Sequence, residues 1–165
     1  MKFEAPQIIT YHERKIIGIS MRLSLNQNKV VQLWRAFIPR KNEIINRIKH
    51  DLISASMYSK DHFLNFDTTR IFKKWAAIEV SNFDHIPEGM ETTIIPGGLY
   101  AVFQYRGLST DPSIFHYIYG TWIPNSIYEL DHRPHFEILG KKYKNNDLDS
   151  EEEIWIPISV KRPTQ

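Results

Sequence analysis

The chain has 165 residues, of which 42% are apolar and 24% are charged. These values are typical of a folded globular protein and argue against disorder and against a membrane protein. The 21 basic and 19 acidic residues are mixed along the chain, so no patch marks nucleic acid or anionic lipid as a partner. The lack of cysteine excludes disulfides, thiolate zinc sites, iron–sulfur clusters and thiol catalysis.

The length fits a single domain, residues 1–165, with one substantial core. The N-terminal residues lack the apolar stretch of a signal peptide, and nowhere do 18 uncharged apolar residues run together. We therefore expect a cytoplasmic protein with no membrane association.

The first half of the chain begins with isoleucine-rich sequence over 8–25, which predicts one or two strands. A helix capped by Asn26 or Asn28 should follow and should break or kink at Pro39, because proline disfavours helix in the residue before it. A second helix is expected over 42–49, and strands over 51–59 and 72–80.

The second half presents the same order. Strand sequence over 90–105 precedes a helix that should start at Asp111–Pro112 and break or kink at Pro124. Strands are expected over 135–143 and 153–160, with a polar loop over 144–150.

A shift of 85 positions superimposes the two halves. In the window 15–58 against 100–143, seven of 44 positions are identical, where chance would give about two or three. The identical positions are 23, 24, 38, 39, 50, 53 and 58. We therefore predict an α+β fold made by tandem duplication of a strand-helix-strand-strand unit, with repeats over 7–85 and 90–161. The duplication predicts a concave, mainly antiparallel sheet with helices on one side and a ligand cleft between the halves.

Alternation along the predicted strands separates core from candidate site. Ile154, Ile156 and Ile158 alternate with Glu153, Trp155 and Pro157, so the isoleucines should form the core face. In the strand before it, His135, Glu137 and Leu139 share one face, and the position that matches Glu137 in the first half is Leu52. A carboxylate among bulky apolar residues is costly unless it is paired, hydrogen-bonded or neutralised, so Glu137 is the leading functional candidate.

Each candidate also has an ordinary structural explanation. Glu137 could be a solvated surface carboxylate paired with Arg133, since exposed glutamate is the norm. Aromatic residues make up 13% of the chain and pack a core as readily as they line a pocket. Aromatic faces beside a buried carboxylate would suit a bulky apolar cation.

Five segments resemble the GyrI-like family, the effector-binding domains of AraC-type regulators. They are Trp75–Val80, Gly98–Phe103, Trp122–Ser126, Arg133–Glu137 and Glu153–Ile158, and together they span nearly the whole chain. The resemblance implies a drug-sensing or effector-binding cleft in which Glu137 is the pocket glutamate. Leu139 departs from the pattern, because many relatives carry an aromatic residue there.

The ligand site implied by this combination holds a small hydrophobic or cationic molecule. We expect Glu137 to bind it, with six further side chains as secondary candidates: Trp155, Trp75, Tyr105, Phe103, Trp122 and Glu153. The family's regulators carry a DNA-reading module, whereas strand sequence here begins by residue 7. We therefore expect a stand-alone binding domain without direct DNA binding, acting as a sensor or sequestering protein.

Two other functions are compatible with the resemblance. Some stand-alone relatives hydrolyse strained electrophiles with a pocket glutamate and a tyrosine, and Glu137 and Tyr105 would then be the catalytic residues. A protein-interaction module that inhibits gyrase is the third hypothesis.

Other catalytic or cofactor signals are weak. His132 and His135 lie at a strand entrance rather than on a helix, so we expect no metal. Gly97–Gly98 precedes a strand and lacks the context of a phosphate loop, and no serine nucleophile elbow is present. No cofactor is expected.

Overall fold

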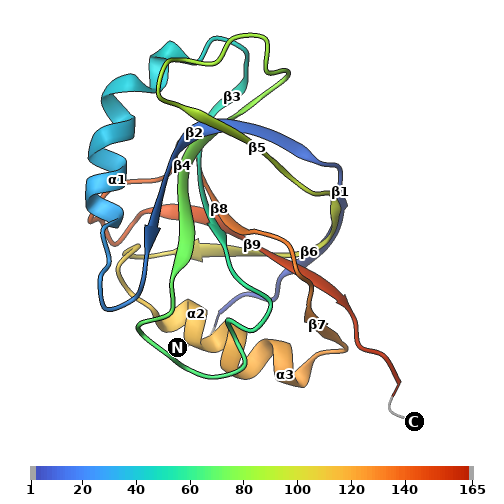
Figure 1. The fold of residues 1–165 in the computed structure, drawn as a ribbon. Coiled ribbons are helices and arrows are strands. Elements are labelled where there is room, and N and C mark those ends of the chain that lie inside the picture. Colours follow the sequence, from blue (N-terminus) through green and yellow to red (C-terminus); the bar gives the residue numbers. More distant parts are fainter. Residues whose placement is uncertain (1–2, 164–165) are drawn as a thin grey trace.

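The computed structural model describes residues 3–163 as an antiparallel sheet with helical segments packed on one face (Figure 1). The α+β prediction is confirmed. The strands are β1 (Gln7–Tyr11), β2 (Arg14–Leu23), β3 (Arg47–Met57), β4 (Phe72–Val80), β5 (Glu91–Ile95), β6 (Gly98–Arg106), β7 (Tyr128–Leu130), β8 (His135–Leu139) and β9 (Glu151–Val160). The helical segments are α1 (Val30–Phe37), the 3₁₀ turn η1 (Ile38–Glu43), α2 (Ser113–Tyr117), the π-helical η2 (Ile118–Trp122) and α3 (Ile123–Asn125).

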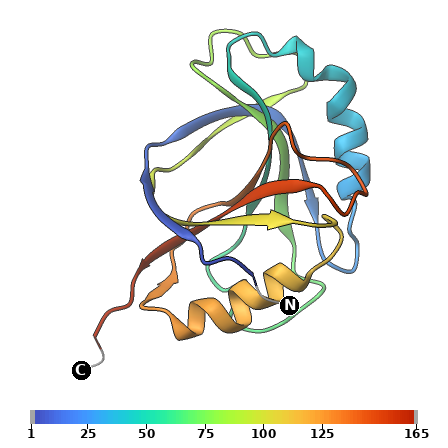
Figure 2. The same cartoon turned by 180° about the vertical axis from the view of Figure 1, so that it is seen from behind.

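The order of strands in the sheet is symmetric about its centre. It runs β1-β6-β9-β8-β3-β4-β2-β5, with β7 added beside β9. Strands β5, β2, β4 and β3 on one side therefore mirror β1, β6, β9 and β8 on the other. In the view from behind, β6 and β9 run side by side above the continuous helical segment α2-η2-α3, and α1 lies at the right of the picture (Figure 2).

The centre of this symmetry lies between β3 and β8. Ile53 pairs with Ile138, which stands 85 positions later in the chain. In a sheet with a two-fold axis between two antiparallel strands, equivalent residues of the two repeats are paired with each other only at the axis. The axis therefore passes through the Ile53–Ile138 pair. The register of the sheet thus agrees with the offset that the sequence repeat predicts.

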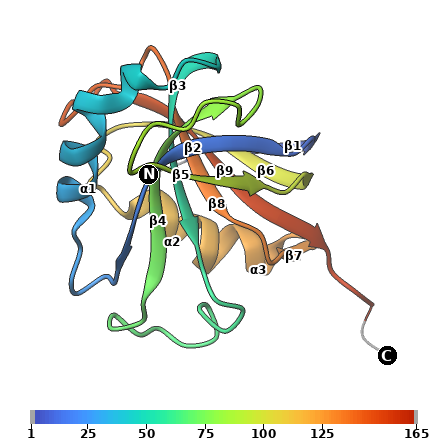
Figure 3. The same cartoon turned by 45° about the horizontal axis from the view of Figure 1, so that its top comes forward.

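The first strand of each half pairs with the other half. β1 pairs with β6 and β5 pairs with β2, so the links at His12–Glu13 and Pro96–Gly97 carry the chain between opposite edges of the sheet. Figure 3 shows α1 at one side of the molecule and β1 with β6 at the opposite side. A Cβ on Gly97 would lie 2.8 Å from the carbonyl oxygen of Tyr11 and 2.9 Å from the amide nitrogen of Glu13, so the two links touch.

We expect Gly97→Ala to destabilise the fold by about 1–3 kcal/mol, because the new methyl group meets backbone atoms that cannot rotate away. Gly120→Ala is the matched control, since apart from its chain neighbours and the backbone of its own helix no atom lies within 4 Å of the position of its Cβ. Urea denaturation of both variants checks the difference. Equal midpoints would show that the links do not pack tightly.

The two faces of the sheet are packed differently. On the helix face, which carries α1 and α2-η2-α3, two separate clusters form around Leu33 and Phe37 of α1 and around Ile114 and Ile118 of α2-η2. The inner face is the opposite one, and a single cluster fills it with side chains from every strand except β7. Its members are Ile9, Tyr11, Ile16, Ile53, Ala55, Met57, Trp75, Ala77, Ile95, Tyr100, Val102, Phe136, Ile138 and Trp155.

Some element boundaries differ from the prediction. The helix expected over 42–49 is wrong: η1 ends at Glu43, and β3 begins at Arg47, which pairs with Val80 of β4. Sheet pairing overrides local helical spacing here. Asn28 accepts a hydrogen bond from the amide of Val30 at 3.0 Å, although the residue at the N-cap of α1 is Lys29. The short strand β7 was not predicted.

No helix within residues 3–163 is both long and apolar enough to cross a membrane.

Candidate functional site

Glu137 lies on the helix face, in the gap between the two helix clusters. It pairs with Ser54 of β3 and Ile154 of β9, and neighbouring strands point paired residues to the same face. Ile154 belongs to the cluster beneath α2, which fixes the face of Glu137. Its side chain is partly buried.

A second carboxyl group accompanies Glu137. Glu152 lies on the same face of β9, two residues before Ile154, and is 6% exposed. Burial raises the pKa of Glu152 to about 9, and the charge of Glu137 and a hydrogen bond to it add to the rise. The protonated Glu152 therefore donates to Glu137, as expected for two carboxyl groups that share one site. Its Oε2 atom is buried without a hydrogen-bond partner among the described residues.

One ammonium group lies beside this carboxyl pair. Lys74 of β4 donates to the hydroxyl of Ser56 at 2.9 Å, and its charge acts on Glu152 in the opposite direction to that of Glu137. Ser54 and Ser56 are both buried in β3 between Lys74 and β8. A polar stripe thus crosses the centre of the helix face.

Aromatic side chains surround the pair. Burial raises the pKa of Tyr58 to about 12 and that of Tyr119 well above its ordinary value, and the charge of Glu137 contributes to both shifts. Tyr119 shares a hydrogen bond of 2.7 Å with Nδ1 of His135. Burial lowers the pKa of His135 to about 3, so this imidazole stays neutral at physiological pH.

Phe63 closes this group from outside. It belongs to the connection between β3 and β4, which Figure 1 shows passing beside α2. Its ring stacks on Tyr119 at 5.1 Å and on His135 at 5.3 Å between centroids, and it remains 42% exposed. We call Tyr58, Phe63, Tyr119 and His135, together with Glu137 and Glu152, the acid cluster.

Open volume borders the acid cluster. A cavity of about 150 Å³ lies beside Tyr58, Phe63 and His135. A groove of about 480 Å³ lies at the other end of β3 and β8, where Leu52 and Leu139 form a cross-strand pair on the helix face.

Trp75 and Trp155 lie on the inner face, so the sheet separates them from Glu137. Trp155 packs against Phe136 and against the guanidinium of Arg14, which lies 4.7 Å from the ring centroid. Arg14 is held by Glu79 at 2.7 Å, and both side chains are at least nine-tenths buried. The inner face therefore already contains its own cation, which these aromatic rings enclose.

Of the remaining predicted residues, Tyr105 borders the acid cluster and the other three lie apart from it. Glu153 points away from Glu137, accepting from Gln104 at 3.2 Å and from the indole of Trp155 at 3.2 Å. Phe103 and Trp122 pack edge to face in the core beneath α2. Tyr105 lies in that core too, directly opposite Glu152 on the neighbouring strand, but its hydroxyl donates to the carbonyl of Leu108 at 2.7 Å. The seven predicted side chains thus do not line one pocket, because some are on the opposite face and others are core.

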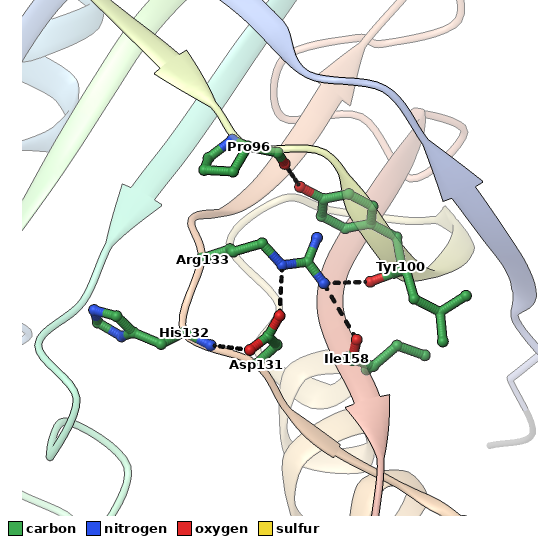
Figure 4. A network of polar contacts seen from close by, with 7 residues as sticks. Pro96, Tyr100, Asp131, His132, Arg133 and Ile158 are labelled. Atoms are coloured by element: carbon green, nitrogen blue, oxygen red, sulfur yellow. Dashed lines mark hydrogen bonds and ion pairs between the residues drawn. The ribbon is translucent and has the colours of Figure 1, made fainter.

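Arg133 does not neutralise Glu137, contrary to the alternative considered from sequence. Figure 4 shows its guanidinium between Asp131 and the strands β6 and β9. It donates to Asp131 at 2.8 Å and to the carbonyl oxygens of Leu99 and Ile158 at 2.6 and 3.2 Å. It also lies over the ring of Tyr100 at 4.5 Å. Arg133 therefore ties the turn before β8 to the sheet.

The arrangement of the acid cluster can hold a cation. If Glu152 loses its proton, the two carboxylates carry two negative charges and Lys74 carries one positive charge. One further cation would then make the site neutral. The surrounding rings provide flat apolar contacts. Within the described residues, no three histidine, aspartate or glutamate side chains gather as metal ligands.

The symmetric sheet, the helices on one face and a carboxyl group between them define an effector-binding domain of the GyrI-like class. Residues 7–158 match the family model of the integron-associated effector binding protein, Cass2, and the chain belongs to that family. It is similar to an integron cassette protein from Vibrio cholerae, with a TM-score of 0.67, 15% identity, and coverage of 95% of this chain and 97% of that one.

Two other relatives extend the comparison. The structure of SAV2435 bound to tetraphenylphosphonium has a TM-score of 0.66 and 15% identity, covering 96% of this chain and 94% of that one. The transcriptional regulator BrlR of Pseudomonas aeruginosa is 26% identical over 151 residues, which are 87% of this chain and 51% of BrlR. The chain thus spans about half the length of that curated relative.

Proposed function

We propose that the chain binds a small hydrophobic cation at the acid cluster and acts as a sensor or sequestering domain. The observation that carries this proposal is the Glu137–Glu152 pair, which lies between the two helix clusters. The tetraphenylphosphonium bound to SAV2435, a structure of the same fold, supports this class of ligand.

The proposed binding of a cation is coupled to the loss of a proton from Glu152. Before binding, Glu152 is protonated, so the site holds one negative charge on Glu137 and one positive charge on Lys74. A bound cation favours the ionised form of Glu152, so one proton leaves as one cation enters and the site stays neutral. Affinity should therefore rise with pH up to about 9, the pKa of Glu152.

Access to the carboxyl pair depends on Phe63. Its ring covers Tyr119 and His135, and its connection to β4 is largely exposed. A ligand enters through the cavity beside Tyr58 when this ring moves aside, and the phenyl ring then adds one apolar wall to the bound cation.

Isothermal titration calorimetry with tetraphenylphosphonium tests the proposal. We expect saturable binding that Glu137→Gln weakens by tenfold or more, equivalent to at least about 1.4 kcal/mol. Measurements in two buffers of different ionisation enthalpy should show close to one proton released for each cation bound. The neutral triphenylphosphine oxide should bind without proton release.

Glu153→Gln is the matched control, because it changes the same residue type on the opposite face of β9. Equal affinities for wild type and both variants would place the binding site elsewhere. Product formation from a strained electrophile, lost in Glu137→Gln, would instead support the hydrolase hypothesis.

A further inference from the structure

The groove at the outer end of β3 and β8 has a character opposite to that of the acid cluster. It measures about 480 Å³, which falls within the range of small-molecule sites. Its walls come from η1, from the first half of β3 and from the connection after β8. The residues that line it are Lys41, Lys49, His50, Asp51, Leu52, Leu139, Gly140, Lys141 and Tyr143.

Three lysines from three separate segments converge on this groove. None of Lys41, Lys49 and Lys141 has a carboxylate within 4.0 Å among the described residues. Asp51 is the one acidic residue of the lining, and its carboxylate lies against Gly140. The groove therefore carries a surplus of two positive charges with imidazole neutral.

The floor of the groove is apolar and fixed. Leu52 and Leu139 are a cross-strand pair on the helix face, and Leu139 is 8% exposed. Tyr143 contributes its ring, and its hydroxyl is within 3.2 Å of the hydroxyl of Ser109. A flat apolar body can therefore lie on these three side chains while the lysines surround its charged end.

We propose that this groove is a second ligand site, one that takes a small aromatic anion carrying a phosphate or a carboxylate. Ammonium groups from Lys41, Lys49 and Lys141 hold the anionic group, and Leu52, Leu139 and Tyr143 contact the aromatic body. The site is distinct from the acid cluster in residues and in the sign of its charge.

Titration of the full chain with phenyl phosphate tests this site, with calorimetry for affinity and ¹⁵N–¹H NMR for position. We expect saturable binding and shifts of the Gly140 and Lys141 amide signals. Benzoate in place of phenyl phosphate shows which anionic group is preferred. Phenol and inorganic phosphate should each bind at least about tenfold more weakly, because each lacks one half of the contact.

Lysine variants test whether phenyl phosphate binds in this groove. Lys49→Gln and Lys141→Gln should each weaken phenyl phosphate about three- to tenfold. Lys142→Gln is the matched control, because this neighbour is outside the groove and lies 3.8 Å from Glu151. Binding that is absent, unchanged by the groove variants or weakened equally by Lys142→Gln would overturn the proposal. Tetraphenylphosphonium affinity should stay unchanged in these variants, which separates this result from the cation site.

Discussion

Arg14→Met should destabilise the protein by about 3–5 kcal/mol, because it leaves the carboxylate of Glu79 buried without a partner. The two side chains meet at 2.7 Å on the inner face, and each is at least nine-tenths buried. Arg14 also lies 4.0 Å from the ring centroid of Tyr11, so its loss removes cation–π contacts as well. Urea denaturation of wild type and variant measures the effect.

Arg106→Met provides the comparison, since Arg106 and Asp149 form an ion pair of the same 2.7 Å length on an exposed surface. We expect no measurable change there, because solvent screens exposed pairs. The double variant Arg14→Met with Glu79→Leu should regain much of the lost stability, since it removes both buried charges. A loss no greater than that of Arg106→Met would show that Glu79 finds another partner.

Glu152→Gln should increase the stability of the fold at alkaline pH, because the substitution removes a carboxyl group that burial keeps protonated. The pKa of Glu152 in the folded protein is about 9, whereas the ordinary pKa of a glutamate side chain is 4.5. A carboxyl group whose pKa is raised by folding stabilises the fold only below its unfolded pKa. The stability of wild type therefore falls progressively as the pH rises from the unfolded to the folded pKa.

Thermal denaturation between pH 5 and 9 measures this dependence. Glutamine keeps a donor for Glu137 and cannot ionise, so the variant should show a flatter profile and a higher melting temperature at pH 8. The exposed neighbour Glu151, changed to glutamine, should leave the profile as it is. Parallel profiles for wild type and Glu152→Gln would mean that the carboxyl pair does not hold a proton.

The sequence allowed much of the fold to be predicted, because its repeat is preserved in the register of the sheet. The offset of 85 positions matches the Ile53–Ile138 pair, and α1 gives way to the 3₁₀ turn η1 just before Pro39. The break expected at Pro124 is wrong, because this proline lies inside α3 and the helical segment continues through it to Asn125. The exchange of β1 and β5 between halves could not be predicted, since it depends on which edges meet in three dimensions.

The candidate site was harder to predict for a related reason. Alternation within one strand gives two faces but does not say which face of the next strand is adjacent, and that depends on register. Glu137 could therefore be singled out, while Glu153 was chosen in place of Glu152. Glu152 did leave a signal, because it is in phase with the isoleucines of β9 and so is a carboxyl group on the core face.

The aromatic side chains around the carboxyl pair could also be identified only from the structure. Tyr58 and Tyr119 are ordinary aromatic residues in sequence, and only the fold brings them to the same carboxyl pair. Phe63 comes from a long connection whose path no periodicity indicates.

The exchange of first strands has a consequence for how such a domain is assembled. Either half alone would offer an edge that its own first strand does not cover, and a second identical half would supply the missing strand. The two repeats are thus arranged like the subunits of a domain-swapped dimer, except that they are joined in one chain. Joining them allows the two copies to diverge, and this has placed Glu137 where its counterpart is Leu52. A pocket made by two identical subunits would carry either two such acids or none.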